Sequence, residues 1–195
     1  MTEGPVTAVF SCVCDQLAPD EWAVGLALRA WDCWCTRHLP AGPPPVVADV
    51  GGVPARLTPR LLGRGPLEVL TIDPVVNCSV EAFVQQHPTA QCHAVFALGV
   101  IEHVKQPVPF LRALAHLVAP GGLCFLTADY WDCEGPDLAE FKPLRERIYH
   151  RASWEETYKA ARTFGLHRFG LADWHYHGPQ IAQTYSLVSL AMVKE

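Results

Sequence analysis

The stretch that decides the fold is residues 46–73, which read VVADVGGVPARLTPRLLGRGPLEVLTID. Two short apolar runs, at residues 46–50 and 67–72, flank a segment of helical character at residues 55–62. Strands that are apolar along their whole length and alternate with helices are typical of a parallel sheet covered by crossover helices. The stretch therefore predicts an α/β fold.

The same alternation continues toward both ends of the chain. Apolar residues recur every three to four positions between Asp20 and Pro40, which predicts an amphipathic helix. A stiff proline-rich linker follows at residues 41–45, because consecutive prolines cannot continue a helix. Ser153 and Glu156 form an apparent capping box for a later helix. The remaining predicted elements are strands at residues 93–98, 123–127, 167–172 and 185–193, and helices at residues 107–118 and 153–164.

One domain accounts for all 195 residues, since we find no repeat and no sign of a second domain. It divides into an N-terminal helical cap (1–40), a core (45–130) and a C-terminal region with the last strands (131–195). The net charge is −5 and the basic residues form no stripe, so we expect no nucleic-acid partner. No run of about 18 apolar residues occurs, so we expect no membrane span. The start of the sequence lacks the character of a secretion signal, and we expect a cytoplasmic protein.

We predict that the eight cysteines are reduced thiols and that they form neither a metal site nor a disulfide framework. Two pairs have the spacing Cys-x-Cys, at Cys12/Cys14 and Cys33/Cys35, whereas structural zinc sites usually use Cys-x-x-Cys with a matching distant pair. Reduced cysteines pack as small apolar side chains. We therefore predict no metal.

Acidic residues and glycines stand where the first two predicted strands end. The first strand ends in Asp49 and Val50 and leads into Gly51 and Gly52, and Asp73 follows the second strand. Ligands of open parallel sheets bind at this edge, where glycines let the backbone approach and an acidic side chain accepts ribose hydroxyls. An acid at the position of Asp73 would also suit a nicotinamide cofactor, although the Gly-x-Gly-x-x-Gly turn that binds such cofactors is absent from the sequence. Asp49 could equally cap a turn.

The segment after the third apolar run is more specific. Residues 95–104 read VFALGVIEHV, residues 110–114 read FLRAL, and residues 118–123 read VAPGGL. Together with the two strand ends, these blocks resemble in order and spacing the class I S-adenosylmethionine-dependent methyltransferases. The resemblance covers about residues 45–130.

This resemblance implies a Rossmann-like three-layer sandwich with a mostly parallel, seven-stranded sheet. Its last strand, at residues 185–193, would be antiparallel. Residues 45–130 would be the core that binds S-adenosylmethionine. The cofactor residues implied by the resemblance are Asp49, Gly51 and Gly52 at the methionine part, Asp73 at the ribose, Ser79 and Val80 near the adenine, and Ala97, Leu98 and Gly99 under the sulfonium.

Methyl transfer mainly requires the nucleophile and the methyl group to be aligned, with a base where the acceptor must lose a proton. His103 and Asp129 are the candidate catalytic residues, because both lie near later strand tips. The alternatives are that a buried His103 imidazole pins the loop by hydrogen bonds and that Asp129 forms a turn.

The C-terminal third is dense in aromatic and histidine side chains, which could form an acceptor pocket or simply cover the sheet edge. Residues 147–149 resemble segments of methyltransferases linked to glycan or cell-surface biosynthesis, so we predict a small-molecule or glycan-like acceptor. The side chains concerned are Tyr130, Trp131, Arg147, Tyr149, His150, Asp173, Trp174, His175, Tyr176 and His177.

Some residues depart from the family pattern and favour a different function. Val53, Pro54 and Ala55 stand in the loop where the family uses further glycines, and Ser79 stands where an acidic residue often contacts the adenine. The alternative is therefore a catalytically inactive methyltransferase-like domain, a pseudoenzyme that serves as a binding or structural subunit. Its apolar N-terminal helix could then contact a protein partner.

Overall fold

The computed structural model describes residues 19–39, 42–52, 56–130, 147–170 and 186–195. The helices are α1 (Pro19–His38), α2 (Thr58–Leu62), α3 (Val80–Gln86), α4 (Pro107–Leu117) and α5 (Arg151–Arg162), with a 3-10 turn η2 (Ile101–His103). The strands are β1 (Val46–Val50), β2 (Glu68–Ile72), β3 (Cys92–Leu98), β4 (Val118–Tyr130), β5 (Leu166–Arg168) and β6 (Ser186–Lys194).

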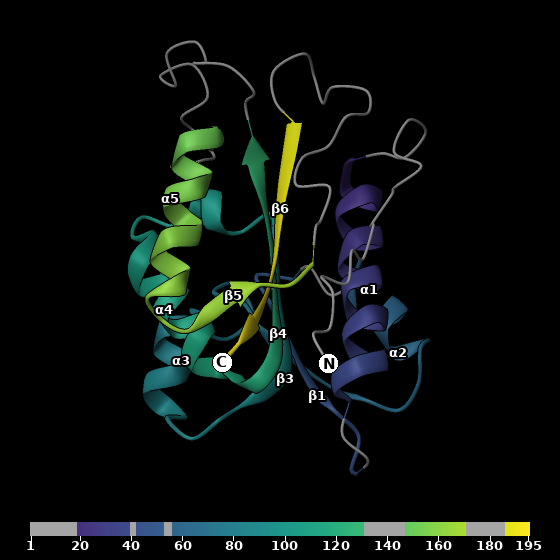
Figure 1. Ribbon diagram of the computed structural model, residues 1–195. Coiled ribbons are helices and arrows are strands. Elements are labelled where there is room, and N and C mark those ends of the chain that lie inside the picture. The colour runs from purple at the N-terminus through teal and green to yellow at the C-terminus, as the bar shows by residue number, and fades with distance from the viewer. Residues whose placement is uncertain (1–18, 40–41, 53–55, 131–146, 171–185) are drawn as a thin grey trace, which may run out of the picture.

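The strands of the described residues form one sheet in the order β2-β1-β3-β4-β6-β5. Strands β1 to β4 are parallel to one another, whereas β6 runs antiparallel to both β4 and β5. Helices α1 and α2 lie on one face of the sheet, and α3, α4 and α5 lie on the other (Figure 1). The predicted Rossmann-like three-layer α/β fold with an antiparallel last strand is confirmed.

The expected seventh strand is not found among the described residues, where the sheet has six strands. The sequence itself shows six apolar runs, and only the family resemblance implied one more. The connection from α3 to β3 is limited to residues 87–91, which is too short for an average strand and its two turns. Strand β2 consequently lies at an edge of the sheet.

Two apolar clusters, one on each face of the sheet, hold the layers together. Trp22 and Trp34 of α1 are buried in one cluster with Phe96 and Phe125 of the central strands. The other cluster joins α3, α4 and α5 to the opposite face of the same strands. Because the apolar side chains of α1 are buried inside the fold, they do not form the exposed surface on which the predicted protein partner would dock.

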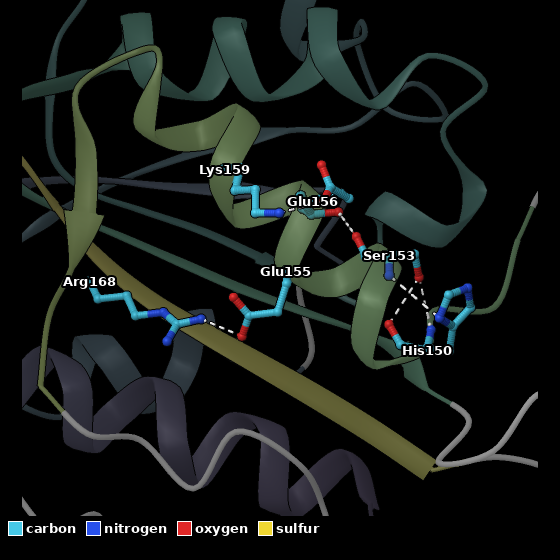
Figure 2. Close-up of polar contacts among 7 residues, drawn as sticks. His150, Ser153, Glu155, Glu156, Lys159 and Arg168 are labelled. Atoms are coloured by element: carbon cyan, nitrogen blue, oxygen red, sulfur yellow. Dashed lines mark hydrogen bonds and ion pairs between the residues drawn. The ribbon is translucent and has the colours of Figure 1, made fainter.

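Helix α5 begins earlier than the sequence predicts. His150 is its N-cap: the His150 N–H donates to Ser153 Oγ at 2.9 Å, and the Ser153 N–H donates to His150 Nδ1 at 3.5 Å (Figure 2). The predicted capping pair of Ser153 and Glu156 is therefore wrong. Glu156 instead forms an exposed ion pair with Lys159 at 2.6 Å.

None of the helices in the described ranges combines the length and the apolar character that crossing a membrane requires. Several predicted residues lie outside the described part of the chain, namely Cys12, Cys14, Val53, Pro54, Ala55, Trp131 and residues 173–177.

Candidate cofactor site

The ends of β1 and β2 bring two carboxylates to the same edge of the sheet. Strands β1 and β2 are parallel, and their last paired residues are Val50 and Ile72. Asp49 comes one residue before this pair on β1, and Asp73 comes one residue after it on β2.

Asp49 is buried, with 2% of its surface exposed. Burial is the main cause of its raised pKa, the charge of Asp73 adds to it, and a hydrogen bond from Thr58 opposes it. The Thr58 hydroxyl donates to Asp49 Oδ2 at 2.9 Å, and this bond ties the start of α2 to the end of β1.

The glycines after β1 are required by the chain's own packing. Gly51 has φ of +67°, and its N–H donates to the carbonyl of Ile72 at 2.7 Å. A Cβ at this position would collide with the side chain of Val100. At Gly52, a Cβ would collide with the Asp49 carboxylate. The space that these glycines leave is therefore filled by Val100 and Asp49.

Asp73 begins a tightly bonded loop after β2. Its side chain is half-buried, and Oδ1 accepts the N–H of Val75 at 2.7 Å. The side chains of Val75 and Val76 are 94% and 64% exposed, so the loop presents apolar surface beside the acid. Asn77, which our sequence reasoning missed, bonds to the backbone of Asp73 at 2.9 Å.

The predicted adenine residues start helix α3. Ser79 is the N-cap, and its hydroxyl accepts the N–H of Ala82 at 3.3 Å. Val80 is buried in the core on the α3 side of the sheet. Ser79 therefore stabilises the start of α3 through its hydroxyl, and Val80 anchors the same turn by packing in the core.

The end of β3 combines core residues with exposed backbone. Ala97 is fully buried, Leu98 is half-buried, and Gly99 is exposed with φ of +66°. The Gly99 N–H donates to Thr127 Oγ1 at 2.9 Å, which fixes the turn to β4. Main chain, rather than side chain, is thus presented at this strand end.

The two predicted catalytic residues lie in different surroundings. His103 is exposed on η2, so the alternative of a buried imidazole does not hold. Asp129 is 5% exposed and belongs to β4, so it does not form a turn. Its N–H donates to Glu102 Oε1 at 3.3 Å, and its carbonyl accepts the N–H of Tyr149 at 2.9 Å. Asp129 is therefore hydrogen-bonded to Glu102, the residue that precedes His103.

Glu102 and Arg147 link three segments at this edge, a role that the sequence did not reveal. The Arg147 N–H donates to the carbonyl of Glu102 at 3.1 Å, and Nη2 donates to the carbonyls of Val104 and Lys105 at 3.1 and 3.0 Å. Tyr149 is buried, and burial is the main cause that raises its pKa to about 12.

Tyr130 and Tyr149, two of the aromatic residues predicted to surround an acceptor, are both buried in the core. They therefore do not line an open pocket. Among the described residues, no group of three His, Cys, Asp or Glu side chains could hold a metal ion.

A groove of about 420 Å³ lies at the opposite edge of the sheet, next to the residues that precede β1 and β2. Trp31 and Asp32 of α1 line it, and Arg64 crosses to Asp32 with bonds of 2.7 and 3.1 Å. The groove is thus separate from the strand ends that carry Asp49 and Asp73.

Comparison with known proteins gives a match at the level of structure. No family model and no curated protein matches the sequence. In contrast, 519 chains of solved structures match the fold. The plantazolicin methyltransferase BamL, solved with a triazolic desmethylPZN analog and SAH, has a TM-score of 0.63 and 12% identity, over 90% of this chain and 85% of BamL.

The chain has the Rossmann-like fold of the class I methyltransferases. A Burkholderia thailandensis 1,6-didemethyltoxoflavin-N1-methyltransferase, solved with 1,6-didemethyltoxoflavin and S-adenosylhomocysteine, has a TM-score of 0.55 and 17% identity over 94% of this chain and 93% of its own. The [4+2]-cyclase SpnF has a TM-score of 0.58 and 14% identity over 85% of this chain and 80% of its own. Because a cyclase shares the fold, the chemistry has to be argued from the site.

Proposed function

We propose that this chain is an S-adenosylmethionine-dependent methyltransferase that acts on a small-molecule or glycan-like acceptor in the cytoplasm. The observation that carries the proposal is the pair of carboxylates, Asp49 and Asp73, which the register of β1 and β2 brings to the carboxyl ends of neighbouring parallel strands. In a Rossmann-like sheet this edge receives the nucleotide. The five cysteines that the structure describes are thiols, a state that a reducing compartment preserves.

The second strand end suits the nucleoside part of the cofactor. Asp73 Oδ1 is already bonded to the Val75 N–H, and the second carboxylate oxygen can accept a ribose hydroxyl. The exposed side chains of Val75 and Val76 offer apolar surface to a purine. In this proposal Ser79 and Val80 support the loop from the start of α3.

The first and third strand ends would face the remainder of the cofactor. Asp49, Gly51 and Gly52 would border its methionine part, with Gly51 and Gly52 contributing main chain. Ala97, Leu98 and Gly99 would form the floor under the sulfonium, where Gly99 is the exposed member. When bound, S-adenosylmethionine supplies a methyl group that is already activated for displacement.

The protein's task is then to align the acceptor and to remove its proton. His103 is the better candidate for the base, because it is exposed at the end of η2, the short turn that follows β3. Asp129 is buried, and its backbone binds Glu102 and Tyr149, so we assign it to positioning of this edge.

The inactive alternative is favoured by a specific observation. The Asp49 carboxylate occupies the space beside Gly52, and Val100 occupies the space beside Gly51. A loop whose glycines are needed for internal packing is compatible with a structural subunit that has lost turnover. A partner of that subunit would have to contact polar residues of α1, because the apolar ones are buried.

Titration calorimetry with S-adenosylhomocysteine separates the two functions. We expect saturable binding by the wild type and a loss of about tenfold or more in Asp73→Ala, since hydrogen bonds to a charged acceptor are removed. Glu156→Ala, an exposed acid on α5, is the matched control and should bind as the wild type does. No binding by the wild type at millimolar ligand would contradict the proposal and support the structural subunit.

A further inference from the structure

Among the described residues, strand β2 has a neighbouring strand on one side only, and its last outward-facing backbone carbonyl is bonded by a side chain. The N–H of Glu68 donates to Pro45 and the carbonyl of Ile72 accepts from Gly51, so these residues direct their backbone toward β1. In a parallel ladder the intervening residues direct theirs away, which places the Thr71 carbonyl on the outer side of β2. Since β2 is an edge strand of the sheet that the described residues form, no strand of that sheet donates to this carbonyl.

The side chain of Asn77 supplies a donor for this carbonyl. Its Nδ2 donates to the Thr71 carbonyl at 2.8 Å. Its Oδ1 accepts the N–H of Asp73 at 2.9 Å and the N–H of Cys78 at 2.7 Å. One planar amide therefore bridges the last outward carbonyl of the strand and the backbone of the acid that follows.

Asp73 also forms hydrogen bonds with the residues that follow it in the loop. Its carbonyl accepts the N–H groups of Val76 and Asn77 at 3.0 and 2.8 Å, and its Oδ1 accepts the Val75 N–H at 2.7 Å. The amide of Asn77 supplies both the donor and the acceptor that these bonds use, whereas a carboxylate lacks the donor and an aliphatic side chain lacks both groups. Asn77 is also the only asparagine in the sequence.

We propose that Asn77 is a positioning residue that holds the Asp73 carboxylate in place for the cofactor ribose, in the role that a further strand beside β2 would otherwise play. The ribose part of this inference rests on the proposed function. The contact itself is a property of the chain and can be measured without any ligand.

A single asparagine allows a direct measurement of the contact. Cell-free expression with [15N]asparagine gives one side-chain NH2 pair and one backbone N–H in a heteronuclear NMR spectrum. We expect one proton of the pair to exchange with solvent more slowly than in the urea-unfolded chain, because it is bonded to the Thr71 carbonyl. Exchange of both protons at the rates of the unfolded chain would overturn the inference, whatever the protein binds.

Binding of S-adenosylhomocysteine then tests the link to Asp73. We expect both Asn77→Ala and Asn77→Asp to weaken binding by about tenfold, because either change removes the donor to Thr71. Gln86→Ala, which removes an exposed amide at the far end of α3, is the matched control and should leave the affinity unchanged. Circular dichroism of each variant should match that of the wild type.

The double variant distinguishes positioning of Asp73 from a general structural role. If Asn77 acts through Asp73, then Asn77→Ala should cause no further loss of affinity in an Asp73→Ala background. Losses that simply multiply would overturn the inference, as would wild-type affinity in both single variants. If the wild type binds no ligand while the slow amide proton is present, the proposed function and the ribose role fail, and the fixed loop stands.

Discussion

The hydroxyl of Thr58 donates a hydrogen bond to the buried carboxylate of Asp49. The substitution Thr58→Val removes this hydroxyl and keeps a branched side chain of similar size. Leaving a buried charged acceptor without its donor costs about 2 kcal/mol. For a chain of this size, each kcal/mol lowers Tm by roughly 2–4 °C, so we expect Thr58→Val to melt about 4–8 °C lower than the wild type.

The loss should also depend on pH, and its sign follows from Asp49. Burial raises the folded-state pKa of Asp49 above its unfolded value, so the stability linked to this group is present in acid and is lost as pH rises through the folded pKa. The Thr58 bond opposes that rise. Its removal moves the pKa further up, so the difference between variant and wild type should grow with increasing pH.

Differential scanning calorimetry from mildly acidic to mildly alkaline pH measures both effects. Thr36→Val is the matched control, because its hydroxyl donates to the Asp32 carbonyl at 2.8 Å on the exposed side of α1. The control should change Tm by little, and by the same amount at every pH. The reasoning is refuted if Thr58→Val lowers Tm no more than Thr36→Val does, or if its effect shrinks as pH rises.

Two further substitutions test the same edge of the sheet. Gly51→Ala should destabilise the fold by about 1–2 kcal/mol in urea denaturation, because φ of +67° is unfavourable for alanine and its Cβ would meet Val100. A Gly51→Ala variant as stable as the wild type would mean that the loop after β1 can shift away from Val100. Arg147→Met should cost about 1–3 kcal/mol by the same assay, since it removes the guanidinium that bonds the carbonyls of Val104 and Lys105. An unchanged denaturation midpoint would show that this bridge does not stabilise the fold.

The architecture was predictable wherever one physical pattern dominates. Residues 46–50 are apolar except for Asp49, because helices cover both faces of a central parallel strand, and the structure has β1 at the same residues. The helix at residues 107–118 was found for a related reason, since α4 buries one face against the sheet. Such patterns depend on burial alone, and burial leaves a clear mark in a sequence.

Boundaries set by individual polar contacts were less predictable. Strand β4 is assigned from Val118, but its pairing with β3 passes from Val118 directly to Leu123 with a shift in register, and Gly121 has φ of +75°. The glycines therefore form an irregularity at the start of the strand, and the sequence alone did not show that the strand begins before them. At α5 a histidine takes the capping position that propensity assigns to serine. Asn77 was missed because its importance depends on β2 being an edge strand, which the sequence does not encode locally.

The glycines of the first loop and the acid of the second carry different weight as signs of cofactor binding. Gly51 and Gly52 each lie where a Cβ would meet a neighbouring side chain, of Val100 and of Asp49, so the packing of the chain accounts for small residues here without a cofactor. Asp73 also has a structural role, since its Oδ1 accepts the Val75 N–H at 2.7 Å, but that bond does not account for the exposed side chains of Val75 and Val76 beside the acid. An apolar side chain left in water beside a fixed carboxylate costs free energy unless a ligand covers it. The end of β2, rather than the glycine loop, is therefore where the function of this chain should be decided.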